Sequence, residues 1–479
     1  MVMVKDLRDL IKAPRVRMAP APTGRLHIGT ARTTLFNYLF AKHEEGKFIL
    51  RIEDTDLARS DPKFEKDIIE NLQWLGIKWD EGPYRQSERT ASYAKWLGEL
   101  LKKKLAYYCF CSEDELEDKR QEQMSRGEAP KYNGKCRELS DGEKKKYLAE
   151  DKPTIIRFKA PAKKVSFHDL IRGELEFDSS LMGDFAIAKN LATPLYNFAV
   201  VVDDFEMEIT HVIRGEDHIS NTPKQILLQE ALGFPQPKYA HLPLILAPDR
   251  SKLSKRHGAV AIADYRKDGY LPETLVNFMA FLGWNPGTER EIFALPSLVK
   301  EFSLQNVQKS GAVFNIKRLD YLNGFYIRQK SVKKLAELCQ PYLPKTDQGY
   351  LEKIVAIYQE RLKKLSEIKE LTDFFFKDKL EYNKELLKWK EMKTQEISQS
   401  LDKSENILSK IKEADWDKEK LEQVLMPEAE KIGDRGYLLW PLRAVLTGQK
   451  ASAGPFEIAA ILGKEKTLKR IKQARELIK

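Results

Sequence analysis

The sequence has few cysteines and no long apolar run. Four cysteines among 479 residues argue against a disulfide framework. No apolar segment reaches the roughly 20 residues that a membrane-spanning helix needs, and residues 1–12 lack the apolar core of a signal peptide. Internal repeats and low-complexity tracts are also absent. We therefore expect a cytoplasmic protein without a membrane partner.

Length and charge are the first positive features. The chain is long enough for three or four domains with large cores. Lys and Arg number 82 against 72 Asp and Glu, which gives a net charge of +10. This excess suits a polyanionic partner, although an ordinary basic soluble protein would also fit.

Strand and helix patterns alternate in the first part of the chain, which predicts a parallel sheet. Residues 15–18 and 48–52 read as strands, with a helix between them that ends at Gly46. Val200–Val202 and residues 209–213 read as further strands. Polar residues follow these strands, namely Glu53, Asp54, Asp203, Asp204 and Arg214. Ligands of such sheets bind beyond the carboxyl ends of the strands, so these residues predict one shared site; the alternative is that they only mark exits into loops.

Residues 19–30, APAPTGRLHIGT, form a turn between a strand and a helix. Such a turn aims backbone N–H groups at a bound phosphate, and Gly24 and Gly29 permit close approach of a ligand. His27 can donate to a phosphate oxygen whose charge grows in the transition state. The alternative is a Pro-rich turn before an ordinary helix, with His27 packed against its neighbours.

Residues 251–258, SKLSKRHG, form a basic loop after a predicted buried strand at residues 239–246. Lys252, Lys255 and Arg256 can stabilise a departing pyrophosphate as its charge builds. Alone, this loop is better interpreted as a solvated surface. Together, the His27 turn and the basic loop predict a two-sided clamp that closes over one nucleoside triphosphate.

These two segments resemble the paired ATP-binding motifs of class I aminoacyl-tRNA synthetases, most closely those of bacterial glutamyl-tRNA synthetases. The likeness continues at residues 51–56, 82–89, 194–204, 212–218 and 440–448. It implies an α/β fold with a Rossmann-type parallel-sheet catalytic domain, an acceptor-binding insertion and an all-α C-terminal anticodon-binding region. The expected divisions are residues 12–105 and 191–260 for the catalytic domain, 106–190 for the insertion, 261–330 for a stem-contact linker domain and 331–479 for the anticodon-binding domain.

The resemblance implies a two-step reaction. Glutamate attacks the α-phosphate of ATP, with Mg²⁺ bridging the phosphates, and gives glutamyl-adenylate and pyrophosphate; the terminal adenosine of tRNA(Glu) then takes the glutamyl group on its 2′-hydroxyl. His27, Lys252 and Lys255 would act by charge and positioning, without a protein nucleophile. A monomer with no obligate protein partner is expected. The implied ATP-binding residues are Pro20, Thr23, Gly24, His27, Gly29, Thr30, Glu216, Ser254, Lys255 and Arg256.

A glutamate pocket needs guanidinium groups for the carboxylates and an acid for the ammonium group. Arg17 and Arg214 are the candidates for the carboxylates, Tyr196 adds a hydroxyl, and Glu53 would accept from the ammonium. The resemblance implies the same residues. Ala21 stands where the family usually has Ser, which removes a hydroxyl near the amino acid.

Three cysteines in the insertion have a spacing typical of zinc sites. Cys109 and Cys111 lie on one tight turn, and Cys136 follows after 24 intervening residues. Some bacterial relatives hold zinc here with a fourth ligand two residues after the last Cys, commonly His, and this chain has Glu138. Zinc bound by these four residues is one hypothesis, and three free buried thiols are the alternative.

In the C-terminal region, Arg361 resembles the arginine with which many relatives read the third anticodon base, which could exclude the tRNA for glutamine. A surface arginine on a charged helix is the alternative. For the whole chain, two other functions stay open: an enzyme that also glutamylates tRNA(Gln), and a non-catalytic tRNA-binding relative. A tRNA-modifying paralogue typically lacks the anticodon domain, and glutaminyl-tRNA synthetase carries β-barrels where this chain reads helical.

Overall fold

The computed structural model describes residues 13–56, 58–150, 152–254, 256 and 260–478. Contacts divide the chain into two units. The sheet unit contains the chain up to Arg266 and Pro272–Ile316, and the helical unit contains Lys267–Leu271 and the chain from Lys317 on. The finer division into four domains stays a prediction.

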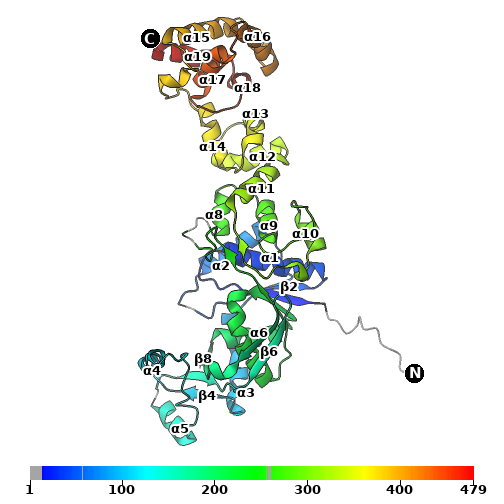
Figure 1. Ribbon diagram of the computed structural model, residues 1–479, viewed down its shortest axis with the longest axis vertical. Coiled ribbons are helices and arrows are strands. Elements are labelled where there is room, and N and C mark those ends of the chain that lie inside the picture. The colour runs from blue at the N-terminus through cyan, green and yellow to red at the C-terminus, as the bar shows by residue number, and fades with distance from the viewer. Residues whose placement is uncertain (1–12, 57, 151, 255, 257–259, 479) are drawn as a thin grey trace, which may run out of the picture. The chain divides into compact units, whose positions relative to one another are not determined.

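The sheet unit is built on parallel strands, as predicted (Figure 1). The strands β1 (Arg15–Met18), β2 (Lys47–Ile52) and β3 (Glu81–Arg85) pair in parallel in that order. The N–H of Thr210 donates to the carbonyl of Arg15 at 2.9 Å and so brings the next parallel pair beside β1. That pair consists of β10 (His211–Gly215) and β11 (Lys238–Leu242).

Part of the predicted insertion joins this sheet. The strand β6 (Lys164–Asp169) runs parallel to β11, and β7 (Gly173–Asp178) is antiparallel to β6. The rest of the insertion forms a separate antiparallel sheet, with the polar helices α4 (Glu113–Ser125) and α5 (Asp141–Ala149) near it (Figure 1). The strands of this sheet are β4 (Ala106–Cys109), β5 (Ile155–Phe158), β8 (Phe185–Asn190) and β9 (Thr193–Pro194).

Helices pack on opposite sides of the parallel strands, and Figure 1 shows α1 and α6 on either side of β2. The helix α1 (Ile28–His43) packs against α9 (Pro272–Ala280) and α10 (Leu295–Glu301). A separate core cluster contains α3 (Thr90–Lys102), α6 (Tyr196–Glu206) and α7 (Thr222–Leu232). The remaining elements of this unit are α2 (Pro62–Trp74), α8 (Ile262–Lys267), β12 (Ile245–Leu246) and β13 (Ala312–Val313).

One strand prediction is wrong. Val200–Val202 was expected to form a strand, but it lies in the helix α6. Every residue from Phe198 to Asp204 is buried, so the valines face core on all sides. A short, fully buried apolar run has no periodicity that separates a strand from a buried helix. Burial on all sides therefore explains the error.

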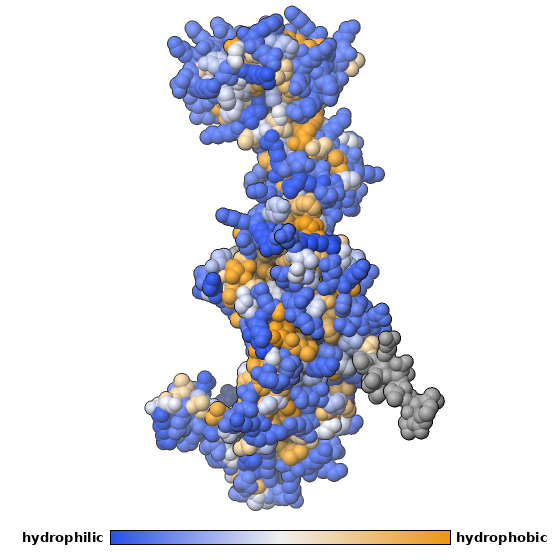
Figure 2. Space-filling view, turned by 45° about the vertical axis from the view of Figure 1, so that its right-hand side comes forward, coloured by the Kyte–Doolittle hydropathy of each residue, from blue (hydrophilic) through white to orange (hydrophobic). Residues whose placement is uncertain are grey.

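The described residues of the helical unit form helices around one hydrophobic core. Hydrophilic side chains predominate on the face of this unit seen in Figure 2, as expected for helices that bury one stripe. None of the described helices is long and apolar enough to cross a membrane. The helices are α11 (Ile316–Arg328), α12 (Val332–Cys339), α13 (Gln348–Tyr358), α14 (Glu367–Thr372), α15 (Thr394–Ser409), α16 (Lys418–Glu430), α17 (Gly436–Thr447), α18 (Pro455–Leu462) and α19 (Lys464–Ile478).

Candidate active site

The turn after β1 ends in a capped helix. His27 is the N-cap of α1, and its Nδ1 accepts a hydrogen bond from the N–H of Gly29 at 3.0 Å. The N–H of Ile28 donates to the carbonyl of Val260 at 2.8 Å. These two N–H groups are therefore engaged within the protein, and the prediction that the turn aims backbone N–H groups at a phosphate concerns its other N–H groups.

The basic loop is anchored at both ends. Its start follows β12 as a tight hairpin, in which the N–H of Leu253 donates to the carbonyl of Ile245 at 3.1 Å. Beyond its end, Ala261 forms an antiparallel bridge with His27. The side chain of Lys252 is 65% exposed and lies 3.8 Å from the carboxylate of Asp217. Lys255 and residues 257–259 lie outside the described residues.

Both halves of the predicted clamp line one cavity of about 400 Å³. His27, Gly29 and Thr30 come from the turn, and Lys252 comes from the basic loop. Four of the five residues predicted for the glutamate pocket line the same cavity: Arg17, Glu53, Tyr196 and Arg214. The spatial premise of the sequence interpretation, that the two segments face one space, is thus met by the described part of the loop.

A second cavity, of about 420 Å³, shares His27, Thr30, Glu53 and Tyr196 with the first. Three further predicted residues line it: Pro20, Ala21 and Gly24. Among the described residues, four that were predicted to bind ATP line neither cavity, namely Thr23, Glu216, Ser254 and Arg256. Glu216 instead forms an ion pair with Arg172 and accepts from the N–H of Leu244 at 2.8 Å.

A network of buried charges holds one end of the cavity. Asp204 in α6 accepts from Arg17 Nε at 3.1 Å and from Arg51 Nη1 at 2.8 Å, and Arg51 Nη2 donates to Glu53 at 3.2 Å. Burial raises the pKa of Asp204, but the charges of Arg17 and Arg51 outweigh it, so the net shift is downward. Burial also raises the pKa of Glu53, against the opposing charges of Arg51 and Arg17. A buried carboxylate of this kind favours an incoming cation.

Arg214 is held by neighbours on the sheet and on α7. Its Nε donates to His241 Nε2 at 3.1 Å, and its Nη2 donates to Thr222 Oγ1 at 2.7 Å. Its Nη1 is buried, and within the described ranges no hydrogen-bond partner reaches it. An unsatisfied buried donor is costly, so this nitrogen is suited to an anionic ligand such as a carboxylate.

Sequence reasoning missed several residues that line the first cavity. His218 accepts from or donates to the Tyr196 hydroxyl at 3.1 Å, and burial lowers its pKa to about 4. Arg32 in α1 is buried, which lowers its pKa to about 10, and it donates to the carbonyl of Leu282 at 3.0 Å. His218 stands within the segment 212–218 that carried the resemblance. Arg32 could have been found as the one charged residue of α1 before Lys42.

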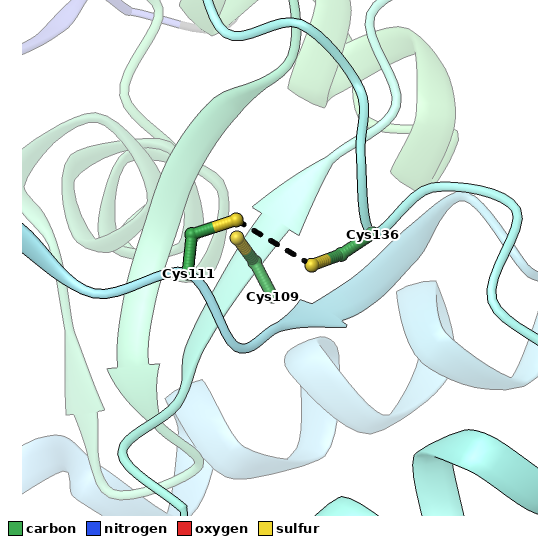
Figure 3. A group of neighbouring side chains, drawn as sticks. All are labelled: Cys109, Cys111 and Cys136. Carbon is green, nitrogen blue, oxygen red and sulfur yellow. Dashed lines mark hydrogen bonds between the residues drawn. The ribbon is translucent and has the colours of Figure 1, made fainter. Parts of the chain in front are cut away.

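The three cysteines of the insertion lie together (Figure 3). Their sulfur atoms are within 4.8 Å of one another, and those of Cys111 and Cys136 are 3.6 Å apart. Burial raises the pKa of the Cys109 thiol, but hydrogen bonds from Tyr132 and Arg157 outweigh this and lower it overall. Three clustered sulfurs fit a soft divalent metal such as zinc.

Glu138 and Tyr132 differ in their relation to this cluster. The side chain of Glu138 is 85% exposed, lies 3.8 Å from Arg137, and is not part of the group of close ligand atoms found in the described residues. The Tyr132 hydroxyl lies 3.4 Å from the sulfur of Cys109 and 3.5 Å from that of Cys111. An oxygen that contacts two of the thiols therefore comes from a residue that the spacing argument did not consider.

Arg361 is exposed at the end of a short turn that follows α13. Arg361 is close enough to Arg443 for the two positive charges to repel each other. The pKa of Arg443 is lowered mainly by burial and, to a smaller extent, by the charge of Arg361. The guanidinium of Arg443 lies 4.3 Å from the ring centroid of Trp440. This face of the helical unit therefore presents two arginines and an aromatic ring, a combination suited to nucleic-acid bases.

Two families match the chain. Residues 14–321 match the family described as the catalytic domain of class I tRNA synthetases (E and Q). Residues 334–475 match the family described as the anticodon binding domain. The first range contains every residue that lines the two cavities.

Individual relatives match over nearly the whole chain. The chain is 47% identical over 484 residues to glutamate–tRNA ligase 1 of Caldicellulosiruptor saccharolyticus, covering 95% of this chain and 98% of that protein. It is 45% identical to the glutamate–tRNA ligase of Carboxydothermus hydrogenoformans, with the same coverage of 95% and 98%. The crystal structure of a glutamate tRNA ligase from Elizabethkingia meningosepticum in complex with its amino acid superposes with a TM-score of 0.87 at 34% identity, covering 98% of this chain and 100% of that chain.

Proposed function

Since the chain belongs to the family of class I tRNA synthetases for E and Q, we propose that it attaches glutamate to tRNA(Glu). ATP first converts glutamate to glutamyl-adenylate and releases pyrophosphate. The terminal adenosine of the tRNA then takes the glutamyl group. One observation carries this proposal: residues suited to a triphosphate and residues suited to glutamate line one cavity.

The proposed roles follow from the charges around that cavity. Arg17 and Arg214 bind the carboxylates of glutamate, because a planar guanidinium holds a carboxylate with parallel hydrogen bonds. Tyr196 contributes its hydroxyl, and Glu53 accepts from the ammonium group. Lys252 stabilises the negative charge that builds on the phosphates during activation. Lys255, outside the described residues, is assigned the same role.

His27 acts beside Lys252 without forming a covalent bond. Its ring lies at the start of α1 and lines the cavity in which the phosphates of ATP are proposed to bind. Holding the two reactants in one orientation supplies much of the acceleration in reactions of this kind. A side chain at this place contributes by orientation and by donating a hydrogen bond to a phosphate oxygen.

Magnesium fits as an ion carried by the nucleotide. Within the described ranges, the grouping of ligand atoms close enough for a metal is the cysteine cluster, so the cavity contributes no cage of carboxylates. Mg²⁺ is commonly bound by phosphate oxygens, waters and one or two carboxylates, and Asp217 is, beside Glu53, one of the two acids in the cavity lining. When bound, the ion neutralises phosphate charge.

The test of the function is pyrophosphate exchange followed by charging. With tRNA(Glu), glutamate and ATP, the protein is expected to exchange labelled pyrophosphate into ATP and to form glutamyl-tRNA. Charging purified tRNA(Glu) and tRNA(Gln) side by side distinguishes a discriminating enzyme, in which Arg361 reads the third anticodon base, from one that glutamylates both. A protein that binds tRNA(Glu) but gives no exchange would be a non-catalytic relative.

Zinc is proposed at Cys109, Cys111 and Cys136. Three thiolates within a few ångströms repel one another unless a cation or protons neutralise them, and zinc does so with tetrahedral geometry. Metal analysis of the wild type should give one zinc per chain, and Cys136→Ser should lose it. Tyr132→Phe and Glu138→Ala then identify the fourth ligand, because only the variant that lacks it should lower zinc affinity. Absence of metal in the wild type would contradict the proposal.

A further inference from the structure

We propose that Asp169 and His241 are positioning residues for the amino-acid pocket, and that they act together by fixing the guanidinium of Arg214. The proposal rests on the proposed assignment of Arg214 to glutamate. Neither residue lines the described cavities, so both would act through Arg214 rather than on the substrate.

The three residues form a series of hydrogen bonds across neighbouring strands. Asp169 ends β6, His241 lies in β11 and Arg214 lies in β10, and these strands are adjacent in the sheet. The Asp169 carboxylate lies 2.6 Å from His241 Nδ1, and His241 Nε2 lies 3.1 Å from Arg214 Nε. Asp169 and His241 have no exposed surface, and Arg214 is 5% exposed. The hydrogen bonds of this series are therefore shielded from water.

The direction of each hydrogen bond in this series is determined. An arginine Nε can only donate, so His241 Nε2 must accept, and the proton of the neutral ring must be on Nδ1, where it is donated to Asp169. Burial lowers the pKa of His241, and the Asp169 hydrogen bond opposes this, while the Arg214 charge acts with burial. The net downward shift keeps the ring neutral and its Nε2 lone pair available to Arg214. Asp169 thus selects the tautomer that Arg214 requires.

Two of the three guanidinium nitrogens of Arg214 are committed by these contacts. Nε donates to His241 and Nη2 to Thr222, and Thr222 Oγ1 itself lies 3.2 Å from His241 Nε2. Because the guanidinium is planar, fixing two nitrogens also fixes the direction of the third. That third nitrogen, Nη1, is the one without a partner in the described chain. A ligand carboxylate would complete the set.

This series of hydrogen bonds also joins two parts of the sequence. Asp169 belongs to the segment predicted as the insertion, at residues 106–190, whereas Arg214 belongs to the predicted catalytic domain. The β6–β7 hairpin that carries Asp169 is paired with the catalytic strands. The orientation of the amino-acid ligand is consequently set in part by a residue of the insertion.

The experiment measures KM for glutamate and for ATP by pyrophosphate exchange in the presence of tRNA(Glu). We expect His241→Asn to raise KM for glutamate by about 10–100-fold, the range seen when orienting partners are removed, with KM for ATP changed less than about twofold. His241→Gln should recover most of the loss, because its amide oxygen can take the place of Nε2, whereas that of Asn reaches only the position of Nδ1. Asp169→Asn should act in the same direction as His241→Asn.

His168→Asn is the matched control. His168 precedes Asp169 in β6, but it is 62% exposed and pairs with Glu174, so its substitution should leave both KM values unchanged. The double variant Asp169→Asn/His241→Asn should lose no more than the worse single variant if the two act in series.

Several results would overturn the proposal. Equal changes in both KM values, equal behaviour of His241→Gln and His241→Asn, or a lowered melting temperature without a change in KM for glutamate would each assign a purely structural role. If Asp169→Asn does not fold, the Gln and Asn variants of His241 still decide the matter. Failure of the proposed function is distinct, because the wild type would then show no glutamate-dependent exchange.

Discussion

Buried charged side chains are concentrated in the sheet unit, whereas the described part of the helical unit contains one, Arg470. The sheet-unit set comprises Arg17, Arg32, Arg51, Arg157, Asp169, Asp184, Asp203, Asp204 and Arg214. Arg470 donates to the backbone carbonyls of Leu446, Phe374 and Lys377 and thereby ties helices together. In the sheet unit, Arg17 and Arg51 instead donate to the carboxylate of Asp204 in another element, and Arg17 lines the cavity. Buried ion pairs add little net stability, so their accumulation beside the cavity indicates a role in orienting ligands.

The largest expected effect tests this contrast in stability. Asp204→Ala would leave Arg17 and Arg51 without their shared carboxylate, and should lower the free energy of unfolding by ~3–5 kcal/mol. Arg470→Met should cost ~1–3 kcal/mol, because it leaves only carbonyl groups unpaired. Glu70→Ala, which removes an exposed partner of Lys66, should cost less than ~1 kcal/mol. Denaturant unfolding measures all three, and a loss for Asp204→Ala no greater than that for Glu70→Ala would contradict the contrast.

The next effect tests the chemistry of the sheet unit alone. Lys252→Ala and Lys255→Ala should each lower the rate of activation by about 10²–10³-fold, the usual cost of removing one group that stabilises transition-state charge. Affinity for tRNA should stay nearly unchanged. Lys66→Ala, an exposed lysine in α2 that is 76% exposed, is the control for loss of a positive charge. Wild-type turnover of both the Lys252 and the Lys255 variant would refute their assignment.

A further pair of variants tests whether each unit binds a different substrate. Arg17→Lys keeps a charge beside Asp204 but loses the planar fork, and should raise KM for glutamate about tenfold, equivalent to ~1.4 kcal/mol. Arg361→Ala should weaken the binding of tRNA(Glu) by ~1–3 kcal/mol, as expected for loss of one base contact. It should leave KM for glutamate unchanged. Steady-state charging with each substrate varied in turn measures both. Reversed or mixed phenotypes would show that the two sites are not separate.

The smallest effect concerns pH. All seven histidines of the chain precede residue 258, so the helical unit has none. Burial lowers the pKa of His211 and of His218 to about 4, below the value of about 6.5 in an unfolded chain. Between these values the unfolded state binds more protons than the folded state, so stability of the sheet unit falls as pH falls from about 6.5 towards 4.

Hydrogen exchange at pH 7 and pH 5, corrected for intrinsic rates, should therefore show greater loss of protection in residues 13–266 than in residues 317–478. His211→Asn should reduce this difference. Equal loss of protection in both ranges would mean that other groups dominate the response to acid.

The sequence predicted the parts of the fold that have regular local patterns. The strands β1 and β2 and the helix α1 are found where the alternating and helical spacings placed them. Of the polar residues predicted to share a site at the strand ends, Glu53 and Arg214 line one cavity, whereas Asp54, Asp203 and Asp204 line neither cavity. Each of these inferences depends on residues close together in the chain or on the general geometry of parallel sheets.

What could not be predicted depends on pairings between distant residues. The valines of α6 carry no periodicity because they are buried on every side. Asp169 gave no signal, since a single charged residue in a strand has no spacing to interpret. Arg51 stood within the segment 51–56 that carried the resemblance, but nothing in that segment indicated its partner. Their partners, His241 and Asp204, are 72 and 153 residues away in the chain. Only the folded sheet brings these charges together.

The hydrogen bond that caps α1 also fixes the electronic state of the ring that makes it. Because the Gly29 N–H donates to Nδ1 of His27, that nitrogen has no room for a hydrogen, and the neutral imidazole must keep its single proton on Nε2. Such a ring can give a hydrogen bond from Nε2 but cannot withdraw a proton there. Proton abstraction from a substrate by His27 is thereby excluded for as long as the helix keeps its cap.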